Sequence, residues 1–97
     1  MALDTESEQI IKQLTELKHE IKRMDSKVHE FISDREKYRH PYPEGLAEKI
    51  RKYERQVYRN PHSEVKLHLD NLLNSLLTYE HSWKRLFQVD AERVRNR

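Results

Sequence analysis

The sequence predicts an all-α fold: a helical bundle of two long coiled-coil-like helices, about 5–39 and 61–93, with a short helix, about 44–59, between them. Both long stretches carry apolar residues at alternating steps of four and three, the repeat of coiled-coil helices. Three prolines and the lone glycine fall where these stretches end, and such residues mark helix boundaries. Ala, Glu, Lys, Leu and Arg also dominate the composition, as in long helices.

The composition excludes several classes of protein. The chain has 97 residues, which predicts a single helical domain over 1–97 with frayed ends at 1–4 and 94–97. It has no cysteine, which excludes disulfide scaffolds and cysteine-based metal or nucleophile sites. One glycine cannot build a P-loop or a dinucleotide-binding loop. No apolar run approaches the ~20 residues of a membrane span, so we expect a cytoplasmic protein.

The first long helix is expected to begin at a capping box formed by Thr5 and Glu8. A heptad seam follows. Its residues are Ile10, Leu14, Leu17, Ile21, Met24, Val28 and Phe31. The phase continues through Arg35 to Tyr38. A charge at the Arg35 seam position predicts that the coiled coil opens there, or that an acidic group from a neighbouring helix reaches it.

Prolines punctuate the rest of the chain. Pro41 and Pro43 end the first helix, and we expect Gly45 to supply conformational freedom in the same turn. Asn60 and Pro61 predict the cap and first residue of the third helix. The third helix has its own seam, which includes Leu69, Leu72, Leu76, Tyr79, Trp83 and Leu86. Further leucines widen this stripe, so the third helix is expected to touch more than one neighbour.

The short helix cannot cover either long one, because each long helix has about 35 residues and spans roughly 50 Å. Part of each seam must therefore meet another long helix. One solution is an antiparallel pair of long helices with 40–60 as an elaborated tip. The other is a half-length up-down-up bundle that dimerises.

A catalytic or metal site is not expected. The six histidines are His19, His29, His40, His62, His68 and His81. They do not repeat at the i, i+3 or i+4 spacing that places ligands on one helix face. Narrow seams leave little room for a pocket that excludes water, so we expect neither an enzyme nor a cofactor.

The charge is unevenly distributed along the chain. Residues 1–34 carry five basic and eight acidic residues, whereas 35–59 carry eight basic and four acidic residues. The predicted partner-binding residues of this basic segment are Arg39, Tyr42, Lys49, Lys52, Arg55, Tyr58 and Arg59. Basic residues interleaved with tyrosines also permit binding to RNA or DNA, which is the alternative prediction.

The third helix resembles the end of a group of uncharacterised helical proteins from myxobacteria and related deltaproteobacteria. The likeness rests on 65–69, Leu72, Thr78-Tyr79 and 83–86, after Asn60. Ser75 and Leu76 depart from it, since the group tends to carry Arg and Tyr there. The resemblance implies a bacterial helical module and no particular activity.

The predicted function is a non-enzymatic protein–protein interaction or scaffold module that acts by helix–helix association. The expected partners are another protein and a second copy of the chain, as a homodimer; neither a membrane nor a small-molecule substrate is expected. A purely structural self-assembly element remains a third interpretation.

Overall fold

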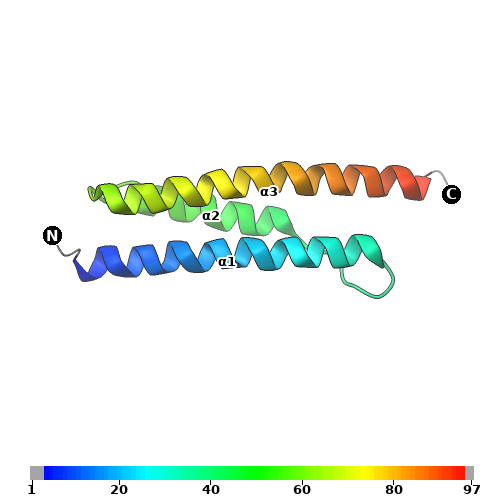
Figure 1. Ribbon diagram of the computed structural model, residues 1–97, viewed down its shortest axis with the longest axis horizontal. Coiled ribbons are helices and arrows are strands. Elements are labelled where there is room, and N and C mark those ends of the chain that lie inside the picture. The colour runs from blue at the N-terminus through cyan, green and yellow to red at the C-terminus, as the bar shows by residue number, and fades with distance from the viewer. Residues whose placement is uncertain (1–3, 96–97) are drawn as a thin grey trace.

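The computed structural model describes residues 4–95 and shows three helices in that range. They are α1 (Thr5–Ser33), α2 (Pro43–Val57) and α3 (Ser63–Arg95). The bundle measures 60 × 20 × 18 Å, and the two long helices run side by side along its length (Figure 1). The predicted all-α class, with two long helices and a short one between them, is confirmed.

The chain runs up, down and up, so α1 and α3 are parallel and α2 is antiparallel to both (Figure 1). Contacts at the two ends of the bundle also show that α1 and α3 run in the same direction. Asp4 lies beside His62 at one end, and the backbone of Ile32 contacts Arg93 at the other. An antiparallel pair of long helices with a tip is therefore wrong. The up-down-up order is correct, but the long helices keep their full length.

The helix boundaries differ from the predicted ones for local reasons. Asp4, rather than Thr5, caps α1 by accepting a hydrogen bond from the Ser7 backbone N–H at 2.7 Å. At its other end α1 stops at Ser33 instead of continuing to 39. Asp34 is extended there, and its side chain accepts hydrogen bonds from the backbone N–H groups of residues 36 and 37, which starts a separate turn.

The residues that were predicted to mark the ends of α2, Gly45 and Asn60, also act differently from the prediction. Gly45 lies inside the first turn of α2 and has no positive φ, so no special conformation requires glycine there. Asn60 does not cap α3 directly. Its side-chain oxygen accepts a hydrogen bond from the His62 N–H, which forms a turn before α3 begins at Ser63. Of the residues predicted to fray, Asp4 caps α1, and Val94 and Arg95 are helical. Residues 1–3 and 96–97 lie outside the described residues.

The core lies along the line where the three helices meet. Apolar residues of α1, α2 and α3 contribute to it, with Leu17, Ile50 and Leu72 all fully buried. Helix α3 contacts both α1 and α2, as its broad apolar stripe predicts. The buried seam residues therefore pack within one chain, with α2 covering part of the length of the two long helices.

Candidate interaction surfaces

All of the predicted seam residues point into the bundle. Nine of them are buried: Leu14, Leu17, Ile21, Val28, Phe31, Leu69, Leu72, Leu76 and Trp83. The other four are half-buried: Ile10, Met24, Tyr79 and Leu86. These side chains hold one chain together, and any partner must bind the outer surfaces of the bundle instead.

The predicted partner-binding residues do not form a tip. The apolar face of α2 packs between the long helices, so 43–57 lies along the side of the bundle (Figure 1). Arg39 and Tyr42 lie in the loop before α2, whereas Tyr58 and Arg59 lie in the turn after it. Lys52 and Arg55 are neighbours on the exposed face of α2, in a shallow groove that Glu44 and Glu48 also line, and Lys49 lines a second groove with Lys52.

Two basic residues of α2 are used to attach it to the long helices. The Lys49 ammonium lies 3.1 Å from a Glu20 carboxylate oxygen of α1. The Arg51 guanidinium makes a bidentate pair with Glu80 of α3, with distances of 2.6 and 3.2 Å. The hydrogen bonds from Arg51 to Glu80 raise the pKa of that guanidinium. Part of the basic charge of 35–59 is thus balanced by acidic residues of α1 and α3.

An apolar groove lies beside the start of α2, where it meets α3. Pro43, Leu77, Trp83 and Phe87 line it, and its volume is about 390 Å³. Leu77 is 50% exposed and lies beside other apolar lining residues, so the groove presents an apolar surface to solvent. Heptad reading missed this groove because Leu77 and Phe87 counted only as residues that broaden the seam. The available signal was the width of the α3 apolar stripe, to which Leu77 and Phe87 contribute outside the heptad positions.

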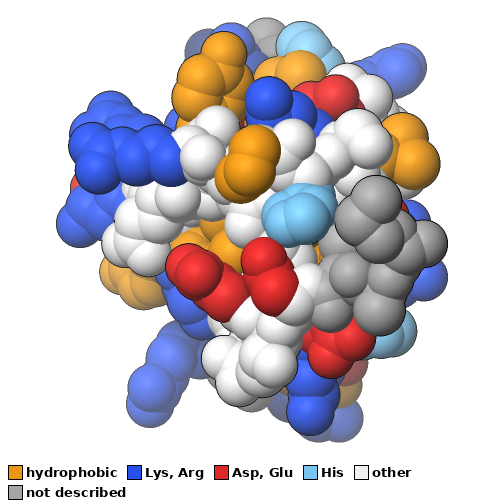
Figure 2. Space-filling view, turned by 90° about the vertical axis from the view of Figure 1, so that its left-hand side faces the viewer, with side chains coloured by type: hydrophobic (Ala, Val, Ile, Leu, Met, Phe, Trp, Pro, Cys, Tyr) orange, Lys and Arg blue, Asp and Glu red, His pale blue; other side chains and the backbone are white. Residues whose placement is uncertain are grey.

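A polar network closes the end of the bundle where α1 begins. The Asn60 side-chain amide donates to the hydroxyl of Ser7 at 3.1 Å, and Ser7 is completely buried. His62 Nε2 lies 3.2 Å from an Asp4 carboxylate oxygen. Figure 2 looks onto this end and shows acidic and histidine side chains near its centre, with most Lys and Arg side chains toward the rim. The network ties the start of α1 to the α2–α3 turn.

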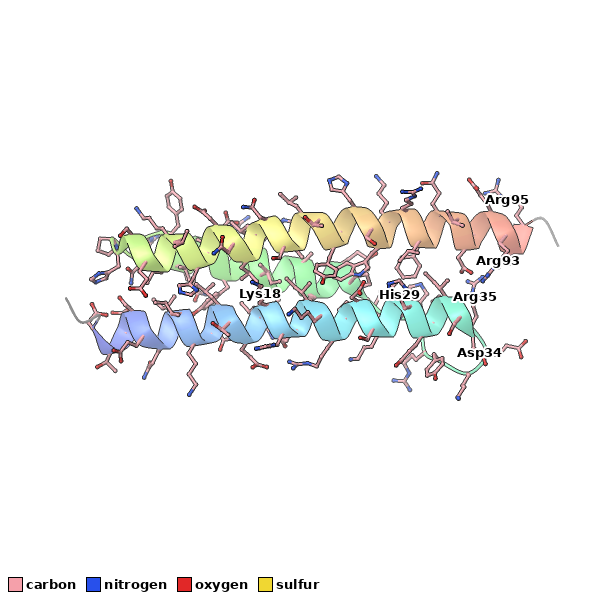
Figure 3. All side chains as sticks on the ribbon, in the orientation of Figure 1. Lys18, His29, Asp34, Arg35, Arg93 and Arg95 are labelled. Carbon is pink, nitrogen blue, oxygen red and sulfur yellow. The ribbon has the colours of Figure 1, made fainter. Side chains whose placement is uncertain are left out.

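A second polar cluster lies at the opposite end. The Asp90 carboxylate is 3% exposed and accepts a hydrogen bond from Arg93 at 2.8 Å. Its other oxygen lies 3.5 Å from Arg35 Nε. Arg93 and Arg35 lie between the ends of α3 and α1 in Figure 3. Of the two alternatives for Arg35, the one in which an acidic group from a neighbouring helix reaches it is confirmed. Arg35 itself lies beyond the end of α1 and so holds no seam position.

The described histidines do not gather into a metal site. His29 pairs with Asp25 on α1, with 3.5 Å between Nε2 and the carboxylate. His40 stacks among aromatic side chains, and His62 contacts Asp4. Across residues 4–95, no group of three or more His, Asp or Glu side chains is placed to hold a metal ion.

The chain matches no protein family model, no curated protein and no solved structure. In residues 4–95, no helix combines the length and the apolar character needed to cross a bilayer.

Proposed function

We propose that the protein is a non-enzymatic interaction or scaffold module that binds another helix through the apolar groove beside α2. A second copy of the chain is the first partner to consider, which would make the protein a homodimer. The exposed Leu77, next to Phe87 and Pro43 in that groove, carries the proposal. Grooves of this kind accept the apolar face of an amphipathic helix. A cytoplasmic location is part of the proposal.

The elongated shape supports this role. The chain exposes 7452 Å², whereas a compact monomer of this mass exposes roughly 5,900 Å². The additional surface leaves room for a partner to lie along the bundle. A stable interface needs about 800 Å² from each partner, and the flanks of the groove offer polar residues, among them Glu44, His81 and Lys84, for its rim.

The test compares two leucines of α3. Leu77→Asp places a charge in the groove, and Leu67→Asp is the control, because Leu67 is 60% exposed and does not line the groove. Sedimentation equilibrium measures self-association, and affinity capture from the native cell measures other partners. We expect Leu77→Asp to abolish both kinds of binding and Leu67→Asp to leave them intact. Equal behaviour of the two variants would show that the groove is not the binding surface.

Binding of RNA or DNA through 35–59 is the alternative proposal. Arg39, Lys52, Arg55 and Arg59 have no ion-pair partner among residues 4–95, which leaves them available to phosphates. Nuclease treatment before affinity capture separates the two proposals. Loss of partners after nuclease, together with affinity that falls steeply with salt, would favour nucleic-acid binding.

A further inference from the structure

Residues 34–42, here called the strap, take the place that a longer α2 would occupy. Helix α2 begins at Pro43, so the last turns of α1 and α3 are not covered by a third helix in the described structure. The strap loops out beside the end of α1 and turns back to the start of α2 (Figure 1), and its His40 ring reaches Phe87 of α3. Its Pro41 is buried, although the neighbouring residues are exposed.

Aromatic stacking holds the far end of the strap. The His40 ring stacks on Phe87 of α3, with 5.4 Å between centroids and 19° between planes. The same ring meets the edge of Phe31 of α1 at 4.7 Å. His40 therefore bridges the two long helices, and its removal would leave the Phe31–Phe87 pair, 6.2 Å apart, open on this side.

Asp90 holds the near end of the strap. Arg35 is the second residue of the strap, and its side chain reaches the buried carboxylate of Asp90 while its guanidinium lies 5.3 Å from the Phe31 ring centre. Arg93 pairs with the same carboxylate and also donates to the Ile32 carbonyl at 3.1 Å. One buried carboxylate is thus connected to α3, to the end of α1 and to the strap.

Burial of the Asp90 carboxylate between the ends of α1 and α3 carries a desolvation cost. Asp90 follows Leu86 in the α3 seam, at a position where an apolar side chain would pack against α1. Asp90 is buried, whereas the side chains of its partners Arg35 and Arg93 are 44% and 58% exposed, so a carboxylate loses its water here for two pairs that stay half in solvent. An apolar residue at position 90 could pack against α1, but it could not form the ion pair that joins α3 to Arg35 of the strap.

We propose that Asp90 and Arg35 form a latch that keeps the strap closed over Phe31 and Phe87, and that the strap opens without unfolding of the bundle. Phe31 is not part of the core cluster that contains Leu17 and Leu72, and most strap residues, 34–37, 39–40 and 42, are exposed. Opening therefore exposes one aromatic pair at one end of the rod. The latch does not depend on the interaction proposed for the groove.

Solution NMR of the full chain tests the latch. The ring protons of His40 report the strap, because stacking on Phe87 shifts them by ring currents, and the methyl groups of Leu17 and Leu72 report the core. All spectra are recorded in one buffer at one pH. Arg35→Ala breaks the latch and retains the Asp90–Arg93 pair, and Asp90→Leu replaces the charge with an apolar side chain.

We expect both variants to move the His40 ring protons to the shifts of an unstructured peptide, with the Leu17 and Leu72 methyl signals unchanged. Arg23→Ala is the matched control, since it breaks the exposed Arg23–Glu16 pair elsewhere on α1. It should change neither the His40 ring shifts nor the core methyl signals. Unchanged His40 shifts in Arg35→Ala or Asp90→Leu would overturn the latch. Equal changes at His40 and at the core methyl groups would also overturn it, because the strap would then open only with the bundle.

Discussion

The indole N–H of Trp83 donates a hydrogen bond to the Asp25 carboxylate at 3.0 Å, which joins the middle of α3 to α1. The two residues are 58 positions apart, and the same separation relates Asp4 and His62 at the end of the bundle. Both contacts thus follow one register along two parallel helices. The bond also satisfies the only polar atom of an indole that is 2% exposed.

Substitutions of Trp83 separate its packing from its hydrogen bond. Trp83→Ala should lower the free energy of unfolding by about 3–5 kcal/mol, because it leaves a large cavity in the core. Trp83→Phe keeps most of the ring and loses the donor to Asp25, which should cost about 1 kcal/mol from the bond itself. Urea denaturation measures both. A Phe variant as unstable as the Ala variant would show that the shape of the indole, not its N–H, decides the packing.

Ser7 should contribute to the free energy of unfolding, although it lies in the first turn of a helix, where substitutions are usually tolerated. Its buried hydroxyl accepts the Asn60 amide, so Ser7→Ala leaves a half-buried donor without that partner. We expect a loss of about 1–3 kcal/mol in urea denaturation. Ser26→Ala is the control, because that serine is exposed and its hydroxyl donates only to a backbone carbonyl of α1. Similar losses for both variants would contradict a role for the end network.

Asp4 should make the stability of the fold depend on pH in the acidic range. The hydrogen bond from the Ser7 backbone N–H lowers the pKa of this carboxyl below its ordinary value of 3.8. The folded state therefore favours the ionised form, and the resulting stability is present above pH 3.8 and lost as the pH falls through the lowered pKa.

Thermal unfolding of the wild type and Asp4→Ala, followed from about pH 6 down to about pH 2, measures this contribution. The difference between their midpoints should be constant near neutral pH and shrink in acid. Asp70→Ala is the control, since Asp70 is exposed and has no hydrogen bond or ion pair among residues 4–95. An Asp4→Ala difference that stays constant throughout would rule out the linkage.

Charge reversal on the exposed face of α2 tests the predicted partner-binding residues. If a partner binds the basic face of α2, as in the alternative proposal, Lys52→Glu combined with Arg55→Glu should weaken binding by reversing the charge there. The fold should stay intact, because both side chains are exposed. Calorimetric titration with the captured partner measures binding, and circular dichroism checks the helices. The matched control reverses Lys18 and Lys22, which lie on the exposed surface of α1. Equal affinity for both variants would exclude the α2 face from the interface.

The helices themselves were predictable, since they depend on local periodicity and on prolines. The seam residues from Leu14 to Leu86 fall in the core because heptad spacing determines which side chains share a helix face. The end of α1 was predicted six residues too late, at 39 instead of 33. Arg35 and Tyr38 keep the heptad phase, but the Asp34 side chain offers the backbone a competing turn.

The sequence by itself determined three helices and their apolar faces, because these depend on spacing along one chain, and it offered an acidic neighbour as one of two explanations for Arg35. Only the tertiary structure decided that the long helices are parallel, that α2 lies along their side, and that Asp90 is the residue that reaches Arg35. Those relationships join residues far apart in sequence, and they follow from how three apolar faces of unequal length pack together. The groove at Leu77 and the strap over Phe87 exist for the same reason: α2 is shorter than the helices that it packs against.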